Sequence, residues 1–164
     1  LLEHYGGTWI DSTVYLTEPL PDTILNSDFF AVRNSLLLID NPVLYPAWFL
    51  HAKKGNKTIR EVRNVAFSYW LKNEHVIEYL LPNLIITLVV KSNPEVEKAI
   101  PYMNSDYSEY LVKVLADDYS EEKWNWIKKL TGIHKLTYKL DADIKHGHNF
   151  YDYLITSSDE KNTK

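Results

Sequence analysis

Residues 5–13 read Tyr5-Gly6-Gly7-Thr8-Trp9-Ile10-Asp11-Ser12-Thr13 and indicate the fold class more strongly than any other stretch. The glycine pair lets the backbone turn sharply or approach a ligand closely, because neither residue has a Cβ atom. Trp9 and Ile10 predict a short buried strand, which ends at Asp11. A carboxylate in that position can face the crevice in which open α/β sheets bind ligands. The stretch therefore predicts an α/β domain with a site at Asp11.

This stretch closely resembles the GGxWxD signature of the bacterial capsular polysaccharide synthesis proteins, which are sugar-nucleotide-dependent glycosyltransferases of the GT-A class. The likeness extends from Leu1 to about Ile155. Four later segments are similar to later elements of the family and keep their order: 13–20, 48–56, 134–139 and 151–155. The resemblance implies a GT-A-like nucleotide-sugar transferase domain with a helix-rich C-terminal half. That domain would span residues 1–156, followed by a polar tail at 157–164.

The start of the chain gives a further expectation. Residues 1–5 predict the last turn of a helix, with no start signal before it. In the family, the upstream part supplies the first strand–helix units, which hold the nucleotide base. The resemblance therefore implies a C-terminal fragment that lacks these units and that alone would bind a UDP-sugar poorly.

The resemblance assigns donor binding to the signature itself, that is to Gly6, Gly7, Trp9, Asp11 and Thr13. Asp11 would be the catalytic residue, holding a divalent cation against the donor diphosphate or hydrogen-bonding the hydroxyls of the donor. Many relatives in the wider class carry Asp-x-Asp, whereas this chain, like much of the capsule subfamily, has Thr13 in place of the second acid. A neutral hydroxyl is a poorer ligand for Mn²⁺ or Mg²⁺ than a carboxylate, so we expect weak metal binding. The structural alternative is that Asp11 caps a turn through Ser12 or Thr13.

The implied activity is transfer of a hexosyl group from a nucleotide sugar, most simply a UDP-sugar, with retention of anomeric configuration. The acceptor would be a capsular polysaccharide or exopolysaccharide precursor, or its lipid-linked oligosaccharide. The sequence shows no clear nucleophile for a covalent intermediate. Front-face attack, held in place by the leaving diphosphate, is therefore preferred.

Composition excludes several other classes. The net charge of −4 argues against nucleic acid or an anionic membrane as a broad electrostatic partner. The absence of cysteine excludes disulfides and Cys-ligated metals. The longest apolar stretch, 79–90, contains Pro82 and Asn83 and is well short of the roughly 20 residues that span a bilayer. We expect a cytoplasmic location, with peripheral association at the inner face of the membrane as an alternative.

Two rival functions remain open at this point. The first is a non-catalytic sugar- or nucleotide-binding module, suggested by the missing upstream part and by Thr13. The second is a metal-dependent hydrolase built on two carboxylates and two imidazoles late in the chain: Asp141, Asp143, His146 and His148. No zinc signature has this spacing, and a solvated loop is the simpler interpretation. A third interpretation has this loop folding over the donor, which makes His146 and His148 weak candidates for contact with the diphosphate.

Local patterns predict the remaining elements. Apolar residues at three- and four-residue spacings predict a helix over 57–72, and Ser120 predicts a helix cap before residues 121–130. The other expected helices lie at 75–81, 84–90, 94–103, 105–116 and 149–155. The expected strands lie at 28–33, 36–39, 48–52 and 136–140. We interpret the acids at 117–122 as helix-start charges, His51 as a core histidine, and Trp124 and Trp126 as divided between core and rim.

Overall fold

The structure is a computed structural model that describes the chain except residues 36–39, 141–143, 145–146 and 162–164. The described chain divides into two units. The first comprises residues 1–12 and 20–105, and the second comprises residues 13–19 and 106–164. Each unit is described by itself below.

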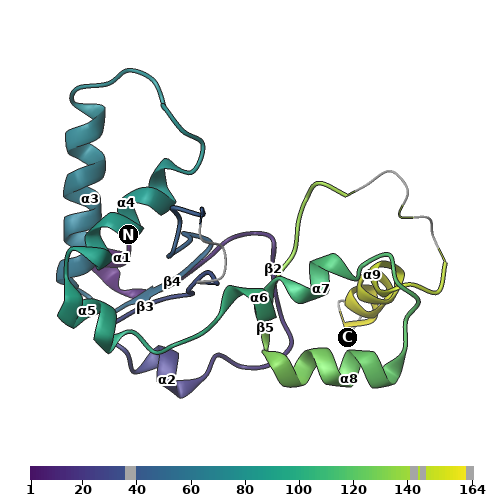
Figure 1. Cartoon of the computed structure of the whole chain (residues 1–164). Coiled ribbons are helices and arrows are strands. Elements are labelled where there is room, and N and C mark those ends of the chain that lie inside the picture. Colours follow the sequence, from purple (N-terminus) through teal and green to yellow (C-terminus); the bar gives the residue numbers. More distant parts are fainter. Residues whose placement is uncertain (36–39, 141–143, 145–146, 162–164) are drawn as a thin grey trace. The chain divides into compact units, whose positions relative to one another are not determined.

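Both units mix helices and strands, so the expected combination of the two in one chain is confirmed (Figure 1). The first unit contains α1 (Leu2–Tyr5), β1 (Gly7–Ile10), α2 (Asp22–Leu25), β3 (Phe29–Ala31), β4 (Phe49–Ala52), α3 (Lys57–Trp70), α4 (Leu81–Lys91) and α5 (Pro94–Ala99). The second contains β2 (Val14–Leu16), α6 (Ser105–Ser108, whose first residue lies in the first unit), α7 (Tyr110–Lys113), α8 (Glu121–Leu130), β5 (Ile133–Lys135) and α9 (Phe150–Lys161). From Leu81 onward β5 is the one strand among the described residues, so the expected helix-rich C-terminal half is confirmed.

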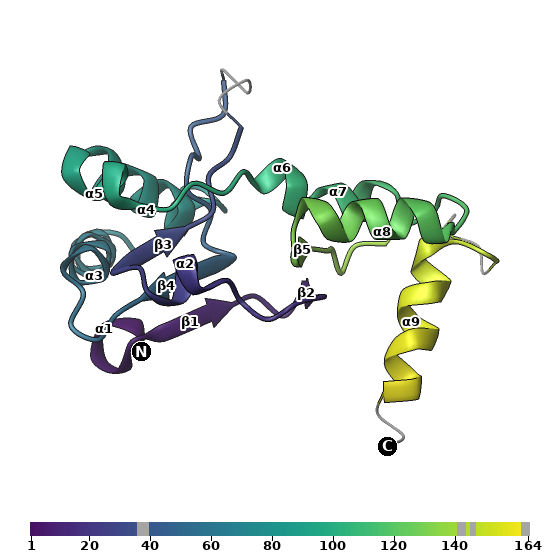
Figure 2. The ribbon, with the colours of Figure 1, turned by 90° about the horizontal axis from the view of Figure 1, so that it is seen from below.

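The sheet of the first unit has the order β1-β4-β3, and both of its pairings are antiparallel (Figure 2). Trp9 lies opposite Leu50, which in turn lies opposite Ala31, so these side chains share one face. Thr8, His51 and Phe30 share the other face by the same register. The open parallel sheet on which crevice sites usually depend is thus absent from the described residues.

Helix α4 covers the first of these faces. Ile86 and Val90 of α4 pack in one cluster with Leu50 and with Phe29 and Ala31 of β3. Helix α3 packs beside α4, and Glu3 of α1 is ion-paired with both Arg60 and Arg63 of α3. The core of this unit therefore lies between the β3-β4 pair and α4.

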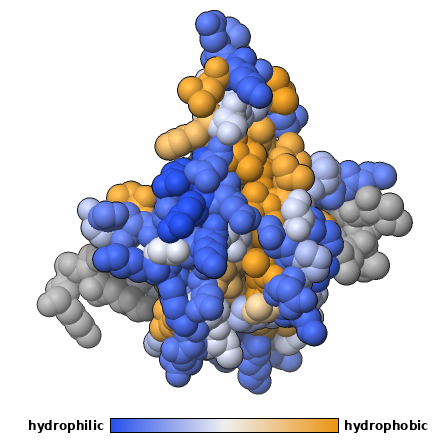
Figure 3. Space-filling view, turned by 90° about the vertical axis from the view of Figure 1, so that its left-hand side faces the viewer, coloured by the Kyte–Doolittle hydropathy of each residue, from blue (hydrophilic) through white to orange (hydrophobic). Residues whose placement is uncertain are grey.

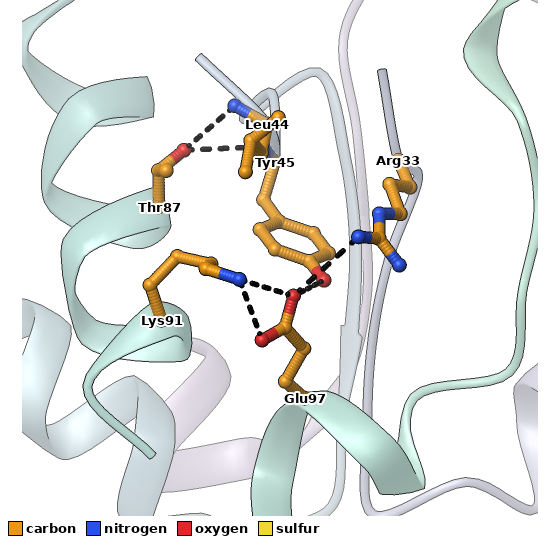
Figure 4. A network of polar contacts seen from close by, with 6 residues as sticks. All are labelled: Arg33, Leu44, Tyr45, Thr87, Lys91 and Glu97. Carbon is orange, nitrogen blue, oxygen red and sulfur yellow. Dashed lines mark hydrogen bonds and ion pairs between the residues drawn. The ribbon is translucent and has the colours of Figure 1, made fainter. Parts of the chain in front are cut away.

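A polar network anchors the loop after β3 to this core (Figure 4). The Tyr45 side chain is fully buried, and its hydroxyl donates to Glu97 Oε1 at 3.1 Å. Lys91 Nζ donates to both Glu97 oxygens at 3.0 and 2.9 Å, and Arg33 lies 3.6 Å from the same carboxylate. The Lys91 hydrogen bonds hold the pKa of Glu97 below its ordinary value, and burial raises the pKa of Tyr45 to about 12. The Thr87 hydroxyl accepts hydrogen bonds from the backbone N–H groups of Leu44 and Tyr45. The network therefore holds the loop after β3 against α4 and α5.

The second unit is built around the antiparallel pair β2-β5 and an aromatic core. Val14 pairs with Lys135 and Leu16 with Ile133. Trp124 of α8 and Phe150 of α9 are buried in one cluster with Leu111 of α7. Tyr119 also stacks on Tyr153 of α9 with ring centroids 4.0 Å apart, and such aromatic pairs contribute beyond the area they bury.

Several predicted elements are confirmed. The helix over 57–72 is α3, the segment 84–90 lies within the helix α4, and the segment 48–52 contains β4. Helix α8 begins after Ser120, whose hydroxyl accepts the Lys123 N–H at 3.2 Å. Trp124 is buried and Trp126 is 46% exposed, which confirms the expected division between core and rim.

Other predictions are wrong. No helix forms over 75–80; α4 begins at Leu81, where Pro82 suits the first helical turn. The helix over 94–103 ends at Ala99, because Ile100 precedes Pro101 and takes the extended backbone that a proline imposes on its predecessor. The segment 105–116 forms two short helices rather than one.

The late part of the chain also differs from expectation. The strand expected at 136–140 lies instead at 133–135, because β2 offers its pairing edge there. Helix α9 continues to Lys161, into the segment that we assigned to a polar tail. The strand expected at 36–39 lies outside the described residues.

Candidate functional site

The glycine pair serves the backbone of the protein itself. Gly6 ends α1 with φ of 71°, and a Cβ at this position would lie 2.6 Å from the backbone N of Lys54. Gly7 has φ of 104°, but a Cβ at this position would lie in open space, with nothing within 4 Å. Of the two explanations for the glycines, a sharp turn and close approach of a ligand, the structure supports the turn at Gly6.

Trp9 is not buried as predicted, since 51% of its surface is exposed. The β1 strand is at the edge of the sheet and is not covered as β3 and β4 are, with a burial pattern that alternates between exposed and half-buried. The indole instead lines an apolar cavity of about 810 Å³ in the first unit. Other lining residues come from β4, α3 and α4, among them Leu50, Val62, Ile85 and Trp70.

Figure 3 shows apolar side chains gathered on this face of the molecule. The lining of the cavity includes three exposed hydrophobic residues, Trp70, Val76 and Tyr79, which lie between the end of α3 and the start of α4. Contiguous apolar surface of this kind is typical of binding sites rather than of ordinary solvent-exposed surface.

Asp11 immediately follows β1 and is half-buried. Its backbone N–H donates to the carbonyl of Trp48 at 2.9 Å, which extends the β1-β4 pairing by one residue. The Ser12 hydroxyl donates to Asp11 Oδ1 at 3.4 Å, a long and therefore weak hydrogen bond. Because strand side chains alternate, Asp11 belongs to the same face as Trp9. The backbone of the candidate catalytic residue is thus fixed by the sheet.

Thr13 lies in the second unit, where its surroundings do not favour a cation. Lys135 Nζ donates to the Thr13 hydroxyl, and the Thr13 carbonyl accepts the Leu136 N–H at 2.8 Å. An ammonium group at this hydroxyl would repel a divalent cation. No group of three or more His, Asp or Glu residues suited to a metal occurs in the described part of the chain. Thr13 therefore offers little to Mn²⁺ or Mg²⁺, and Asp11 is a single carboxylate, so neither residue would hold such an ion without further ligands.

The late cluster is described in part only. Asp141, Asp143 and His146 lie outside the described residues. His148 is exposed, and its carbonyl accepts the Tyr119 N–H at 2.6 Å. It borders a cavity of about 510 Å³ together with Asp152 and Tyr153 of α9.

The acids at 117–122 have the structural role that we expected. Lys123 Nζ lies 2.6 Å from Asp117 Oδ2, and the Tyr119 hydroxyl donates to Glu121 Oε2 at 2.6 Å. Glu121 and Glu122 also lie in the first turn of α8, where carboxylates interact favourably with the helix dipole.

Two buried histidines are more unusual than the sequence suggested. His51 is 6% exposed, and its Nδ1 lies 2.9 Å from Thr8 Oγ1. Burial lowers the pKa of His51, and the Leu25 carbonyl partly opposes this effect. His134 is fully buried beside Thr17 Oγ1, at 3.1 Å, and burial lowers its pKa to about 4. The position of His134 directly after Ile133 was the one sequence signal for its burial.

No helix among the described residues is both long enough and apolar enough to cross a membrane. No curated protein matches the chain, and no solved structure does. A family model described as capsular polysaccharide synthesis protein matches residues 1–154. That match covers both units, and it confirms the family that the sequence predicted. The chain therefore belongs to the capsular polysaccharide synthesis protein family.

Proposed function

We propose that this protein is a glycosyltransferase that moves a hexosyl group from a nucleotide sugar, a UDP-sugar in the simplest case, to a capsular polysaccharide precursor. Membership of the family implies a role in capsular polysaccharide synthesis. The observation that supports the finer activity is the placement of Asp11, a half-buried carboxylate at the end of a strand whose backbone is held by Trp48. A carboxylate on a rigid strand end keeps its geometry during reaction, which is what transition-state stabilisation requires.

In the proposed reaction the bond between the anomeric carbon and the diphosphate oxygen breaks, and the acceptor hydroxyl oxygen bonds to the anomeric carbon. The proton of that hydroxyl passes to the departing diphosphate. Attack from the same face as the leaving group retains the anomeric configuration and needs no protein nucleophile. Asp11 would orient the donor by accepting hydrogen bonds from its ribose or sugar hydroxyls.

The protein itself offers few ligands for a divalent cation. Asp11 is one carboxylate, and the Thr13 hydroxyl accepts from Lys135. Hard cations need about six oxygen ligands, so most would have to come from the diphosphate and water. Mn²⁺ or Mg²⁺ would accordingly bind together with the donor.

The apolar cavity beside Trp9 supports a lipid-linked form of the acceptor. It lies in the same unit as Asp11 and on the same face of β1, and its volume of about 810 Å³ is in the range of small-molecule sites. Its lining is mostly aliphatic and aromatic, which suits the hydrocarbon part of a lipid-linked oligosaccharide.

The decisive experiment is a transfer assay with a panel of radiolabelled nucleotide hexoses and a lipid-linked capsule precursor. Wild-type protein is expected to transfer label from one donor, and Asp11→Ala is expected to transfer none above background. Asp22→Asn is the matched control, because Asp22 is an exposed aspartate of the same unit, in α2. Equal transfer by wild type and Asp11→Ala would refute the role of Asp11.

A non-catalytic sugar- or nucleotide-binding module is the second candidate. The contact between Lys135 and Thr13 favours it, since it occupies the position where many relatives carry a metal-binding acid. This candidate predicts saturable binding of a nucleotide sugar with no transfer from any donor of the panel. Transfer of label would exclude it.

A further inference from the structure

A second cavity of the first unit lies at the opposite end of β1 from Asp11. It has a volume of about 850 Å³ and is formed where β4 turns into α3. Lys53, the first residue after β4, follows Ala52, which pairs with Gly7 at the start of β1. A strand of four residues is about 13 Å long, so this cavity is separate from the Asp11 site. We call it the α3 cavity and define it by Asp28, Lys53, Lys54, Lys57, Thr58 and Glu95.

Backbone N–H groups point out of the α3 terminus. The helix has 14 residues, and Gly55, with φ of 76°, makes the turn that leads into it. The Asn56 side chain caps the Ile59 N–H at 3.0 Å. The N–H groups of Lys57 and Thr58 make no hydrogen bond to any described residue. Such first-turn donors, together with the helix dipole, favour an anion.

Thr58 gives the second and independent observation. Its side chain is 5% exposed and lines the α3 cavity, yet its hydroxyl has no hydrogen-bond partner among the described residues. The hydroxyl oxygen is not among the fully enclosed side-chain atoms that lack a partner, so it is accessible to solvent and can donate to a ligand in the cavity. Its position beside the first-turn N–H groups makes it a donor to the same ligand.

The charges of the α3 cavity also favour an anion. Lys53 Nζ lies 2.7 Å from Asp28 Oδ1, so these two charges neutralise each other. Lys54 and Lys57 form no ion pair with any described residue, while Glu95 of α5 is the remaining acid. The α3 cavity therefore contains two lysines and a helix N-terminus, which favour an anion, and one acid without an ion pair among the described residues, Glu95, which opposes it.

We propose that the α3 cavity binds a phosphate group, with the first-turn N–H groups, the Thr58 hydroxyl and the Lys54 and Lys57 ammonium groups as its donors. The cavity is larger than a phosphate ion requires, which leaves room for the group that is esterified to it. Asn26 and Glu95 line the same space and can hydrogen-bond hydroxyls. The ligand class is thus a phosphorylated sugar or polyol, bound independently of Asp11.

Calorimetry on the whole chain tests this proposal with two probes, inorganic phosphate and glucose 1-phosphate. Both are expected to bind with one-to-one stoichiometry, and added NaCl should weaken the binding because exposed charges are screened. The double variant Lys54→Gln/Lys57→Gln should lose tenfold or more in affinity, the scale of one charge-assisted hydrogen bond. Lys72→Gln, which removes an exposed lysine of the same unit outside the cavity, should bind like wild type.

Three further variants fix the chemistry of the α3 cavity. Thr58→Val should lose about threefold to tenfold in affinity, whereas Thr58→Ser, which keeps the hydroxyl, should bind like wild type. Glu95→Gln should strengthen binding about twofold to threefold, because it removes a like charge from the anion. Thermal unfolding shows which variants are folded. If Thr58→Val does not fold, the affinities of the lysine variant and of Glu95→Gln test the phosphate site without it.

Several outcomes would overturn the proposal. They are no saturable binding of either probe up to about 10 mM, equal loss in the Lys72→Gln control, or weaker binding in Glu95→Gln, which would indicate a cation site. Binding of inorganic phosphate with rejection of glucose 1-phosphate would overturn the assignment of the ligand class. Asp11→Asn should leave binding of both probes unchanged, so failure here is distinguishable from failure of the proposed transferase activity.

Discussion

The two ends of strand β1 differ in what their residues do. At the Gly6 end, the backbone packs so closely on Lys54 that only glycine fits. At the other end, Asp11 is half-buried, and its backbone N–H is bonded to the Trp48 carbonyl of the neighbouring strand end. One short signature thus combines a folding constraint with a candidate catalytic group. The residues of one signature therefore do not all belong to the candidate site, even when they are only five positions apart.

Asp11→Asn tests whether the Asp11 end of β1 supplies a catalytic group. We expect turnover to fall by about two to three orders of magnitude, the scale of losing one transition-state contact. The melting temperature should change little, because asparagine has nearly the shape of aspartate and keeps the backbone bond to Trp48. Steady-state transfer assays beside thermal unfolding measure both quantities. Near-wild-type turnover would remove Asp11 from the mechanism.

Gly6→Ala should lower the stability of the protein, the property that Asp11→Asn should leave nearly unchanged. A Cβ 2.6 Å from the Lys54 nitrogen, on a residue with φ of 71°, should destabilise the protein by about 2–4 kcal/mol, combining conformational strain with overpacking. Gly7→Ala, whose Cβ meets nothing within 4 Å, should cost only about 1–2 kcal/mol of strain. Denaturant unfolding measures both. If Gly7→Ala were the more damaging change, the assignment of the tight contact to Gly6 would be wrong.

The sequence predicts those elements best whose signals are local. Helix α3 follows from a 3.6-residue apolar period, and α8 follows from the Ser120 cap. Strand β5 was misplaced by three residues, because its register depends on pairing with β2, more than 100 residues earlier in the chain. No local pattern reports such a pairing.

The candidate site shows the same division between local and distant information. The place of Asp11 at the end of a strand was predictable from residues 5–13. The exposure of Trp9 was not, because it depends on which strands the helices cover: β3 and β4 are covered, whereas β1 is not. The Lys135 contact with Thr13 was equally inaccessible, since it joins residues that are adjacent only after folding.

His51 lies opposite Thr8, between the two ends of β1. Its titration should make the stability of this part of the sheet depend on pH. Its folded-state pKa is lowered by burial, below the value of about 6.5 expected in the unfolded chain. At pH values below about 6.5 the unfolded state therefore binds more protons, and the free energy of unfolding should fall as the pH decreases. Above that range His51 should contribute no pH dependence.

Denaturant unfolding of wild type and His51→Asn between pH 8 and pH 5 measures this contribution. Asparagine places an amide near the position of Nδ1, so it can keep the hydrogen bond to Thr8 without titrating. The decline in stability toward low pH should be shallower in His51→Asn, while the contribution of His134 is common to both proteins. Equal slopes would show that His51 is not held in its neutral form by the fold.

The smallest expected effect concerns the cation at the Asp11 end. Free protein should bind Mn²⁺ weakly, and the affinity should rise when UDP is added, because the diphosphate supplies the missing oxygen ligands. Asp11→Asn should abolish that rise. Thr13→Val should change the affinity in the presence of UDP by less than about threefold, because its hydroxyl already accepts from Lys135. Calorimetry with and without UDP measures all three. Tight Mn²⁺ binding by the free protein, unaffected by Asp11→Asn, would locate the metal elsewhere, and the cluster that includes His148 would be the next candidate.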